Sequence, residues 1–310
     1  MAYNLKEQMN KPERFEAGHR LCAGCGAGIV CRAMMRAVDP EDKAVICNAT
    51  GCLEVSSFQY PYTAWDDSYI HTAFANAGAT ASGVEAAYNA LKRRGKVEEN
   101  YKILAIGGDG GTYDIGFQSL SGALERGHDL TYFCYDNNAY MNTGTQRSSA
   151  TPKFASATTT PAGIESVGKK QVQKDLTQIV VAHGSPYVAQ TTLIGNMKDF
   201  HEKAHKAIYT EGATFVNVLC PCPRGWGYPA EDLAEICKLA VETCIWPLFE
   251  VENGEYRLSY RPKQKLPVEE FMIKQARFKH CFKPGNEWTI ENAQADVDRK
   301  WDALLRKCGQ

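Results

Sequence analysis

The segment Ile103-Leu-Ala-Ile-Gly-Gly-Asp-Gly-Gly-Thr112 is an apolar run that ends in four glycines around one aspartate. A second apolar run, Leu130 to Tyr135, leads into Asp-Asn-Asn-Ala139 and so ends in a pair of asparagines. Both runs have the length and composition of buried strands. Because α/β proteins bind ligands where their parallel strands end, we expect a phosphorylated ligand and its metal at these two tips.

Further strands and helices alternate along the chain on both sides of this segment. This alternation predicts an α/β fold with a mostly parallel sheet and helices on both faces. We expect strands at 44–47, 103–107, 130–135, 187–192 and 214–219, and helices at 29–38, 73–91, 114–126, 170–183, 197–209 and 231–244. Residues 56–71 are aromatic and read as irregular.

The carboxyl-terminal part has a different character. Asn253-Gly254 predicts the turn of a small hairpin, and the last fifty residues read as an irregular tail. We therefore expect residues 1–250 to form one cofactor-binding domain. Residues 251–310 would be an extension that packs on this domain or on a partner subunit.

The composition excludes several classes of partner. The 310 residues are 44% hydrophobic and 23% charged, with a formal net charge of −1, so a polyanion or nucleic-acid partner is not expected. No window approaches 18 uninterrupted apolar residues, and the first ten residues lack the pattern of a signal peptide. We expect a cytoplasmic protein without a membrane partner.

Twelve cysteines are a high number for a chain without a secretion signal, which makes a disulfide framework the weaker explanation. Five lie inside apolar runs and are expected to be core residues: Cys31, Cys47, Cys134, Cys237 and Cys244. Five others lie beside Gly and Pro in loops: Cys22, Cys25, Cys52, Cys220 and Cys222. The Cys22-Ala-Gly-Cys25 loop is tight enough for two thiolates to face one centre.

The glycine-rich loop has the composition of an anion and metal site. Its glycines let the backbone approach a ligand and donate N–H groups at a helix N-terminus. Asp109 is a hard oxygen donor suited to Mg²⁺, and Asn137 offers a second. The 26 residues between Gly110 and Asn137 hold about one helix and one strand, so their strands are expected to be neighbours. The alternative is a glycine-rich turn followed by an unrelated strand.

Gly108-Asp-Gly110, followed after 26 residues by Asn137-Asn138, resembles the thiamine-diphosphate binding motif of thiamine enzymes. The resemblance implies that Asp109, Asn137 and the backbone carbonyl of Ala139 bind the Mg²⁺ that holds the diphosphate. The implied cofactor-binding residues are Gly51, Gly108, Asp109, Gly110, Gly111, Asn137, Asn142, Thr143 and Gly144.

Cys22-Ala-Gly-Cys25, Asn48-Ala-Thr-Gly-Cys52 and Pro221-Cys222-Pro223 resemble the β chain of the 2-oxoacid:ferredoxin oxidoreductases. The resemblance implies a [4Fe–4S] cluster held by Cys22, Cys25, Cys52 and Cys222, with Cys220 a close competitor for the fourth position. A structural Zn²⁺ site is the alternative use of four thiolates. A cluster is favoured because a one-electron acceptor beside thiamine explains why the two motifs occur together.

The resemblance implies oxidative decarboxylation of a 2-oxoacid, with pyruvate and coenzyme A as the default substrates and oxalate or another 2-oxoacid open. It implies α- and γ/δ-type partner subunits and ferredoxin, and a thiamine-activating carboxylate supplied by another chain. Asn142 and His71 match family positions near the cofactor and are our candidate catalytic residues, although His71 is also explained as a hydrogen-bonded core histidine. Asp66-Asp67 departs from the family pattern near a possible substrate pocket, and the aromatic stretch there is also explained as a subunit interface.

Two other classes of function remain. One is a non-redox thiamine decarboxylase or transketolase-like subunit with structural zinc, and the other is a cluster-bearing scaffold without activity of its own. A third motif, His201-Glu-Lys-Ala-His205, matches the zinc-protease pattern. Its helix has a core stripe flanked by the two histidines and no evident third ligand, so we expect an ordinary amphipathic helix.

Overall fold

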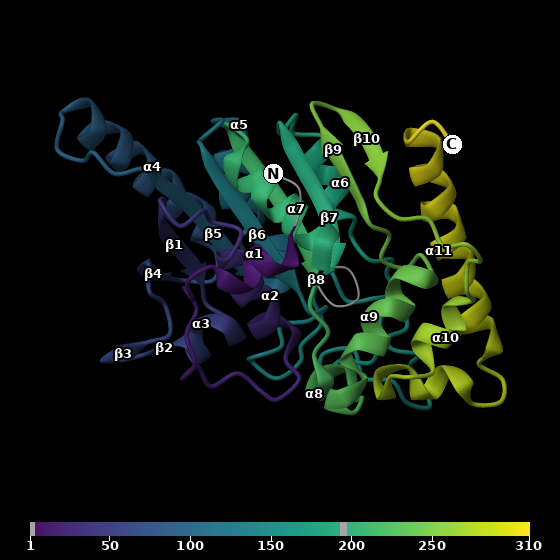
Figure 1. The fold of residues 1–310 in the computed structure, drawn as a ribbon. Helices are drawn as coiled ribbons and strands as arrows, with labels where there is room; N and C mark the ends of the chain where they lie inside the picture. Colours follow the sequence, from purple (N-terminus) through teal and green to yellow (C-terminus); the bar gives the residue numbers. More distant parts are fainter. Residues whose placement is uncertain (1–3, 193–196) are drawn as a thin grey trace.

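The computed structural model describes residues 4–192 and 197–310. An eight-stranded sheet in the order β10-β9-β7-β8-β6-β5-β1-β4 runs through its centre (Figure 1). Strands β4, β1, β5, β6, β8 and β7 are parallel to their neighbours in this order. Strand β9 is antiparallel to β7 and to β10, so β9 and β10 form an antiparallel edge. The main strands are β1 (Lys43–Ala49), β4 (Ser68–Thr72), β5 (Tyr101–Gly108), β6 (Leu130–Asp136), β7 (Tyr187–Thr192), β8 (Ala213–Leu219), β9 (Phe249–Glu252) and β10 (Glu255–Leu258). The predicted α/β class is confirmed.

Helices cover both faces of this sheet, which is why its central strands are apolar without alternation. In β5, Leu104 and Ile106 pack in one core cluster, while Ile103 and Ala105 pack in another. The first cluster includes residues of α2 (Gly26–Met35) and α7 (Met197–Tyr209). The second includes residues of α4 (Ala77–Arg93), α5 (Phe117–Glu125) and α6 (Leu176–Val181).

The small residues of α4 allow a close approach to α5. A Cβ atom on Gly78 would lie 2.8 Å from the carbonyl oxygen of Ser119, which is inside van der Waals contact. Any larger residue at position 78 would push α5 outward, and α5 follows the predicted cofactor loop.

Two predictions about secondary structure before residue 250 were wrong. Residues 56–71 are not irregular but contain β2 (Phe58–Gln59), β3 (Tyr62–Thr63) and most of β4, and the β2–β3 hairpin projects from the molecule (Figure 1). The helix expected at 170–183 begins only at Leu176, because the Asp175 side chain caps it by accepting from the Gln178 N–H at 3.3 Å.

The carboxyl-terminal tail is also more ordered than expected. It contains α10 (Val268–Met272), a 3₁₀ turn (Ala276–Phe282) and the 21-residue α11 (Glu287–Lys307). These elements share a third core cluster with Trp226, α9 (Leu233–Glu242) and β9. A boundary at residues 250/251 would cut β9, and the division into a domain and an extension stays a prediction.

The remaining helices are α1 (Leu5–Asn10), α3 (Cys52–Ser57) and α8 (Pro223–Trp226). Among the helices that the structure describes, none has both the length and the apolar character needed to span a membrane.

Candidate active site

Four neighbouring strands deliver polar or thiol side chains to one edge of the sheet. They are β8, β6, β5 and β1, which lie in this order and are parallel. Cys222, Asn137, Asp109 and Cys52 follow their respective carboxyl ends. The sequence prediction that β5 and β6 are neighbours is confirmed, with Gly108 opposite Tyr135.

Asp109 is fully buried at the end of β5. Its carboxylate accepts hydrogen bonds from the Ser148 hydroxyl at 2.5 Å and from the Asn137 N–H at 3.3 Å. Burial, reinforced by the nearby carboxylate of Asp136, raises the pKa of Asp109 well above its ordinary value. No cationic side chain forms an ion pair with it among the described residues, and a metal cation would stabilise its charged form.

Three oxygen-bearing groups converge beside this carboxylate. One terminal atom of the Asn137 amide lies 3.0 Å from both Asp109 Oδ1 and the carbonyl oxygen of Ala139. With the amide oxygen in that position, three oxygens face one another. With the amide reversed, its NH₂ group donates to both neighbours. Octahedral Mg²⁺ with bonds of about 2.1 Å brings adjacent ligand oxygens to within about 3 Å of each other, so the first arrangement fits Mg²⁺.

Glycines form the wall next to these oxygens. Gly51, Gly108, Gly110, Gly111 and Asn142 line a small cavity of about 20 Å³. A Cβ on Gly110 would lie 2.5 Å from the Tyr140 ring, so only glycine fits between this ring and the loop. Thr143 and Gly144 do not line the cavity. They lie in the adjoining turn, where the Thr143 hydroxyl donates to Gln146 at 2.5 Å.

A second buried acid, Asp136, supports the asparagine pair and was not found from the sequence. Tyr113 donates its phenol to Asp136 at 2.7 Å, and the Asn138 backbone and amide both donate to the other carboxylate oxygen. Burial raises the pKa of Asp136 to about 6, despite these bonds and the Arg277 charge. The sequence does not distinguish this buried aspartate at the end of a strand from an exposed one.

The four predicted cluster cysteines come together beside the glycine cavity. Cys22 and Cys25 precede α2, Cys52 begins α3, and Cys222 caps α8 with its sulfur accepting from the Gly225 N–H at 3.3 Å. Burial, reinforced by the thiols of Cys222, Cys25 and Cys22, raises the pKa of Cys52 to about 12. These thiols are therefore neutral in the structure, and their ionised forms would be stabilised by a shared cationic centre such as an iron–sulfur cluster or a zinc ion. All twelve cysteines are free thiols.

Cys220, two residues before Cys222, is more deeply buried than the four predicted cluster cysteines. It is 1% exposed and packs in the core cluster that contains α2. Burial raises the pKa of Cys220 well above its ordinary value, and the nearby Cys25 adds to this effect. Over the described residues, no three His, Cys, Asp or Glu side chains are grouped closely enough to hold a single metal ion.

Trp226 and Arg277 connect the cysteine loop to the asparagine loop. The Trp226 indole donates to the Asn137 carbonyl at 2.7 Å. Arg277 lies 3.8 Å over the same indole ring and donates to the Asn138 side chain at 3.2 Å. The sequence shows Trp226 in a Gly-Trp-Gly segment, but it gives no indication of Arg277, which arrives from the carboxyl-terminal region.

Comparisons with known proteins identify the family of the chain. The family model described as "Thiamine pyrophosphate enzyme, C-terminal TPP binding domain" matches residues 49–218. Pyruvate synthase subunit PorB of Methanocaldococcus jannaschii is 52% identical over 299 residues, which cover 96% of this chain and 98% of the relative. The chain belongs to the thiamine-dependent 2-oxoacid:ferredoxin oxidoreductase β subunits.

Two further relatives mark the range of this family. PorB of Thermotoga maritima is 48% identical over 98% of this chain and 96% of its own length. Ketoisovalerate oxidoreductase subunit VorB of Pyrococcus furiosus is 42% identical over 98% of this chain and 96% of its own length. A solved 2-oxoglutarate:ferredoxin oxidoreductase from Magnetococcus marinus shares the fold, with a TM-score of 0.56 and 24% identity over 74% of this chain and 78% of its own.

His71 of this β subunit is half exposed at the end of β4. Its Nδ1 lies 2.8 Å from Glu54 Oε1, and its ring stacks on Phe58 at 6.3 Å. Glu54 is 5% exposed, and its second carboxylate oxygen has no hydrogen-bond partner. His71 is therefore a surface histidine held by a buried carboxylate of α3, rather than a core histidine.

Asp66 and Asp67 have different surroundings. Asp66 is exposed, whereas Asp67 pairs with Arg14 at 3.1 Å and accepts the Ala44 N–H at 2.9 Å. Asp67 thus ties the amino-terminal segment to the sheet. Tyr60 and Tyr62 of the β2–β3 hairpin are 89% and 78% exposed.

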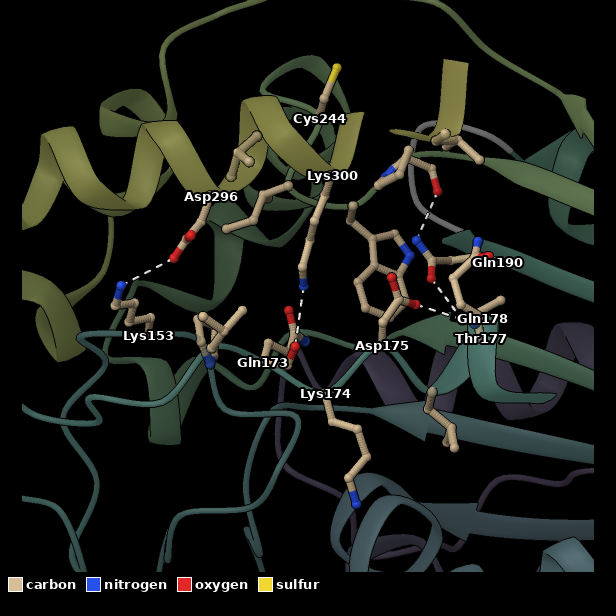
Figure 2. A pocket seen from close by; sticks show the side chains of 18 of the residues that line it. Lys153, Gln173, Lys174, Asp175, Thr177, Gln178, Gln190, Cys244, Asp296 and Lys300 are labelled. Atoms are coloured by element: carbon tan, nitrogen blue, oxygen red, sulfur yellow. Dashed lines mark hydrogen bonds and ion pairs between the residues drawn. The ribbon is translucent and has the colours of Figure 1, made fainter. Parts of the chain in front are cut away.

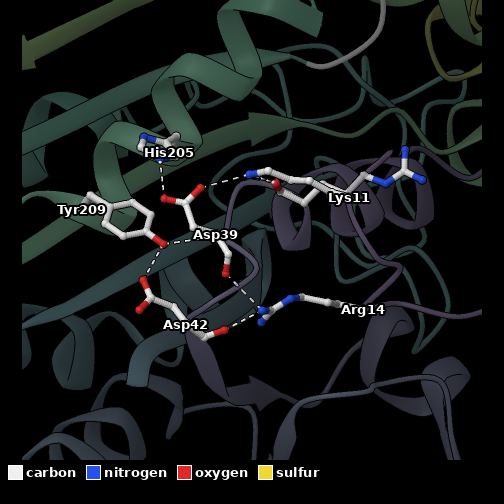
Figure 3. Close-up of polar contacts among 7 residues, drawn as sticks. Lys11, Arg14, Asp39, Asp42, His205 and Tyr209 are labelled. Atoms are coloured by element: carbon white, nitrogen blue, oxygen red, sulfur yellow. Dashed lines mark hydrogen bonds and ion pairs between the residues drawn. The ribbon is translucent and has the colours of Figure 1, made fainter. Parts of the chain in front are cut away.

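The zinc-protease motif of this β subunit has a structural role. His205 Nε2 lies 3.3 Å from Asp39, and its ring stacks on Tyr209 at 4.5 Å (Figure 3). Lys11 also binds Asp39, at 3.1 Å, and Tyr209 donates to Asp42 at 2.7 Å. These contacts fasten α7 to residues 11–42, and the other motif histidine, His201, is 8% exposed.

Proposed function

We propose that this β subunit binds thiamine diphosphate through Mg²⁺, together with one [4Fe–4S] cluster, and oxidatively decarboxylates pyruvate with coenzyme A as acyl acceptor. When bound, thiamine diphosphate supplies the carbanion chemistry of 2-oxoacid decarboxylation, and a low-potential cluster accepts electrons one at a time. The chain's own residues hold, orient and insulate these groups.

The observation that carries the proposal is the order of the four strand ends. Asp109 and Asn137 follow the two central strands, and Cys52 and Cys222 follow the strands on either side. A metal-bound diphosphate and a cluster held by these residues would be adjacent, which short-range electron transfer requires. We propose Asp109, Asn137 and the Ala139 carbonyl as Mg²⁺ ligands, and Cys22, Cys25, Cys52 and Cys222 as cluster ligands.

The glycine cavity supports the position of the diphosphate. Gly51, Gly108, Gly110 and Gly111 have no side chain that would keep a phosphate from the backbone, and Asn142 lines the same cavity. We propose that Thr143 and Gly144, in the adjoining turn, contact the cofactor. We also propose that Asn142 and His71 face the substrate. The 2.8 Å contact between His71 and the Glu54 carboxylate supports this role by fixing the imidazole ring.

Pyruvate is the proposed substrate because the relatives with 52% and 48% identity are named pyruvate synthase subunits, whereas the ketoisovalerate relative is 42% identical. We propose that α- and γ/δ-type subunits complete the site, with the thiamine-activating carboxylate among their contributions, and that ferredoxin accepts the electrons.

The test is an anaerobic assay of the chain assembled with its partner subunits. We expect pyruvate to give the fastest coenzyme A-dependent reduction of viologen in a panel of pyruvate, 2-oxoisovalerate, 2-oxoglutarate, oxalate and an aryl pyruvate. Iron and acid-labile sulfide analyses should give four of each per chain, after allowance for the clusters of the partners. Zinc without iron in the β subunit, or 2-oxoacid turnover that does not reduce viologen, would overturn the proposal in favour of a non-redox thiamine enzyme.

A further inference from the structure

A second cavity in the described part of the chain is much larger than the glycine cavity. It has a volume of about 190 Å³ and lies between α11, the start of α6 and the segment that leads into β9 (Figure 2). Its walls share no residue with the glycine cavity. The proposed function assigns it no role.

The walls of this cavity are largely apolar. They include six side chains that are each at most 6% exposed: Leu176, Trp246, Phe249, Phe278, Val297 and Leu304. Pockets for small ligands have this character, with a few polar groups that fix the ligand's orientation. An enclosed water occupies roughly 10–15 Å³ measured in this way, so the cavity has room for a ligand of about ten non-hydrogen atoms.

Four lysines and two aspartates lie around the cavity, so the lining charges sum to 4 − 2 = +2. Two of these lysines are paired with carboxylates. Lys153 lies 3.2 Å from Asp296, and Lys174 lies 3.6 Å from Asp114, which is outside the cavity. Lys307 has neutral partners, Gln178 and Tyr256. The Asp175 carboxylate accepts a hydrogen bond from the Gln178 N–H in the first turn of α6.

Lys300 is the charged group that extends into the cavity. Figure 2 shows it reaching from α11 across the space, whereas Lys174 points away. Its ammonium donates to the Gln173 carbonyl at 3.2 Å, the one hydrogen bond it makes within residues 4–192 and 197–310. An ammonium has three donors, so two of them are available to a ligand. Burial lowers the pKa of Lys300, and Asp175 and Asp296 oppose this effect.

We propose that this cavity is a second ligand site and that it binds an amphiphilic monocarboxylate, with the carboxylate on Lys300 and the apolar chain against Val297, Leu304 and Phe278. A single ammonium matches one carboxylate. A phosphate group is a poorer match, because the described lining residues include no arginine to bind it in a bidentate manner. The apolar walls require a ligand with a hydrocarbon body of roughly eight carbons.

The test uses octanoate as the probe and calorimetric titration of the assembled enzyme. We expect a Kd on the order of 1 mM or below. Lys300→Met keeps the length of the side chain and removes its charge, and it should weaken binding at least tenfold. Val297→Trp fills the cavity and should abolish binding. Lys263→Met, at an exposed lysine outside the cavity, is the matched control and should bind as the unaltered enzyme does.

Octanol separates the role of the carboxylate from that of the chain, and it should bind at least tenfold more weakly than octanoate. Equal binding of octanol and octanoate, or unchanged octanoate affinity in Lys300→Met, would overturn the proposal. So would binding to the isolated chain that disappears in the assembled enzyme, because a partner subunit would then occupy the cavity. Viologen reduction is not part of this test, so its outcome is independent of the proposed function.

Discussion

The indole N–H of Trp226 donates a 2.7 Å hydrogen bond to the backbone carbonyl of Asn137. Trp226 lies in the helical turn that Cys222 caps, and Asn137 is the proposed Mg²⁺ ligand. One hydrogen bond thus joins the loop of a proposed cluster ligand to the loop of a proposed metal ligand. Arg277, stacked 3.8 Å over the same indole and bonded to Asn138, holds both loops from the carboxyl-terminal side.

Replacing Trp226 by Phe should weaken thiamine diphosphate binding. The change keeps an aromatic ring against Arg277 but leaves the buried Asn137 carbonyl without its donor, at a cost of about 1–3 kcal/mol. We expect a rise in the Kd for thiamine diphosphate of roughly tenfold, measured by calorimetry in Mg²⁺ buffer. Trp288→Phe is the matched control, since Trp288 is 48% exposed and far from this contact in sequence. Equal affinities in the two variants would show that the hydrogen bond does not position Asn137.

Asp109→Asn should separate cofactor binding from the stability of the cofactor-free chain. The carboxylate is fully buried without a cationic side chain beside it among the described residues, so removing its charge should leave the melting temperature unchanged or raise it. The added stability from saturating thiamine diphosphate and Mg²⁺, about 3 kcal/mol at a hundred times Kd, should be lost. Thermal melts with and without both ligands measure the two effects. Asp66→Asn, at an exposed position, should keep the full ligand-induced shift, and a shift retained in Asp109→Asn would exclude Asp109 as the metal ligand.

Much of this site could be predicted from the sequence because its signals are local. The apolar runs of β5 and β6 end in residue types that are typical of a ligand-binding loop, and the 26 residues between Gly110 and Asn137 hold one helix and one strand. The supporting residues could not be predicted in this way. Arg277 bonds to Asn138 across 139 positions, and Tyr113 reaches Asp136 from a different element. Such contacts depend on tertiary packing, which local sequence patterns do not predict.

The helix α11 was missed for a different reason. Its buried face is a narrow stripe, Ala293, Val297, Trp301 and Leu304, within a mostly polar segment. The spacing of four, four and three residues is helical, but the stripe has one residue per turn and the segment has a low average hydrophobicity. Reading periodicity rather than average composition would have predicted the helix.

Cys222→Ser and Cys220→Ser should have opposite effects. Cys222 lies among the predicted cluster thiols, so its serine variant should lose iron, acid-labile sulfide and the visible cluster band after anaerobic reconstitution. Cys220 is 1% exposed in the core, so its serine variant should keep the cluster and lose about 1–3 kcal/mol of stability to a buried hydroxyl. Both variants are compared by iron content and by chemical denaturation. Loss of iron in Cys220→Ser alone would assign the fourth ligand to Cys220.

His201 should make the chain less stable in acid. Burial lowers the pKa of His201 from an ordinary 6.5 to about 4. A hydrogen bond with the Arg36 backbone opposes this shift, and the charge of Lys11 adds to it. Because the folded pKa lies below the unfolded one, the unfolded chain binds the proton first as pH falls. The contribution of neutral His201 to the free energy of unfolding is complete above pH 6.5. It decreases toward pH 4, by at most roughly 3 kcal/mol. Urea denaturation at several pH values should show this slope, and His201→Gln should flatten it between pH 6.5 and 4 whatever its effect at pH 7. An identical slope in the variant would assign the acid sensitivity to other groups.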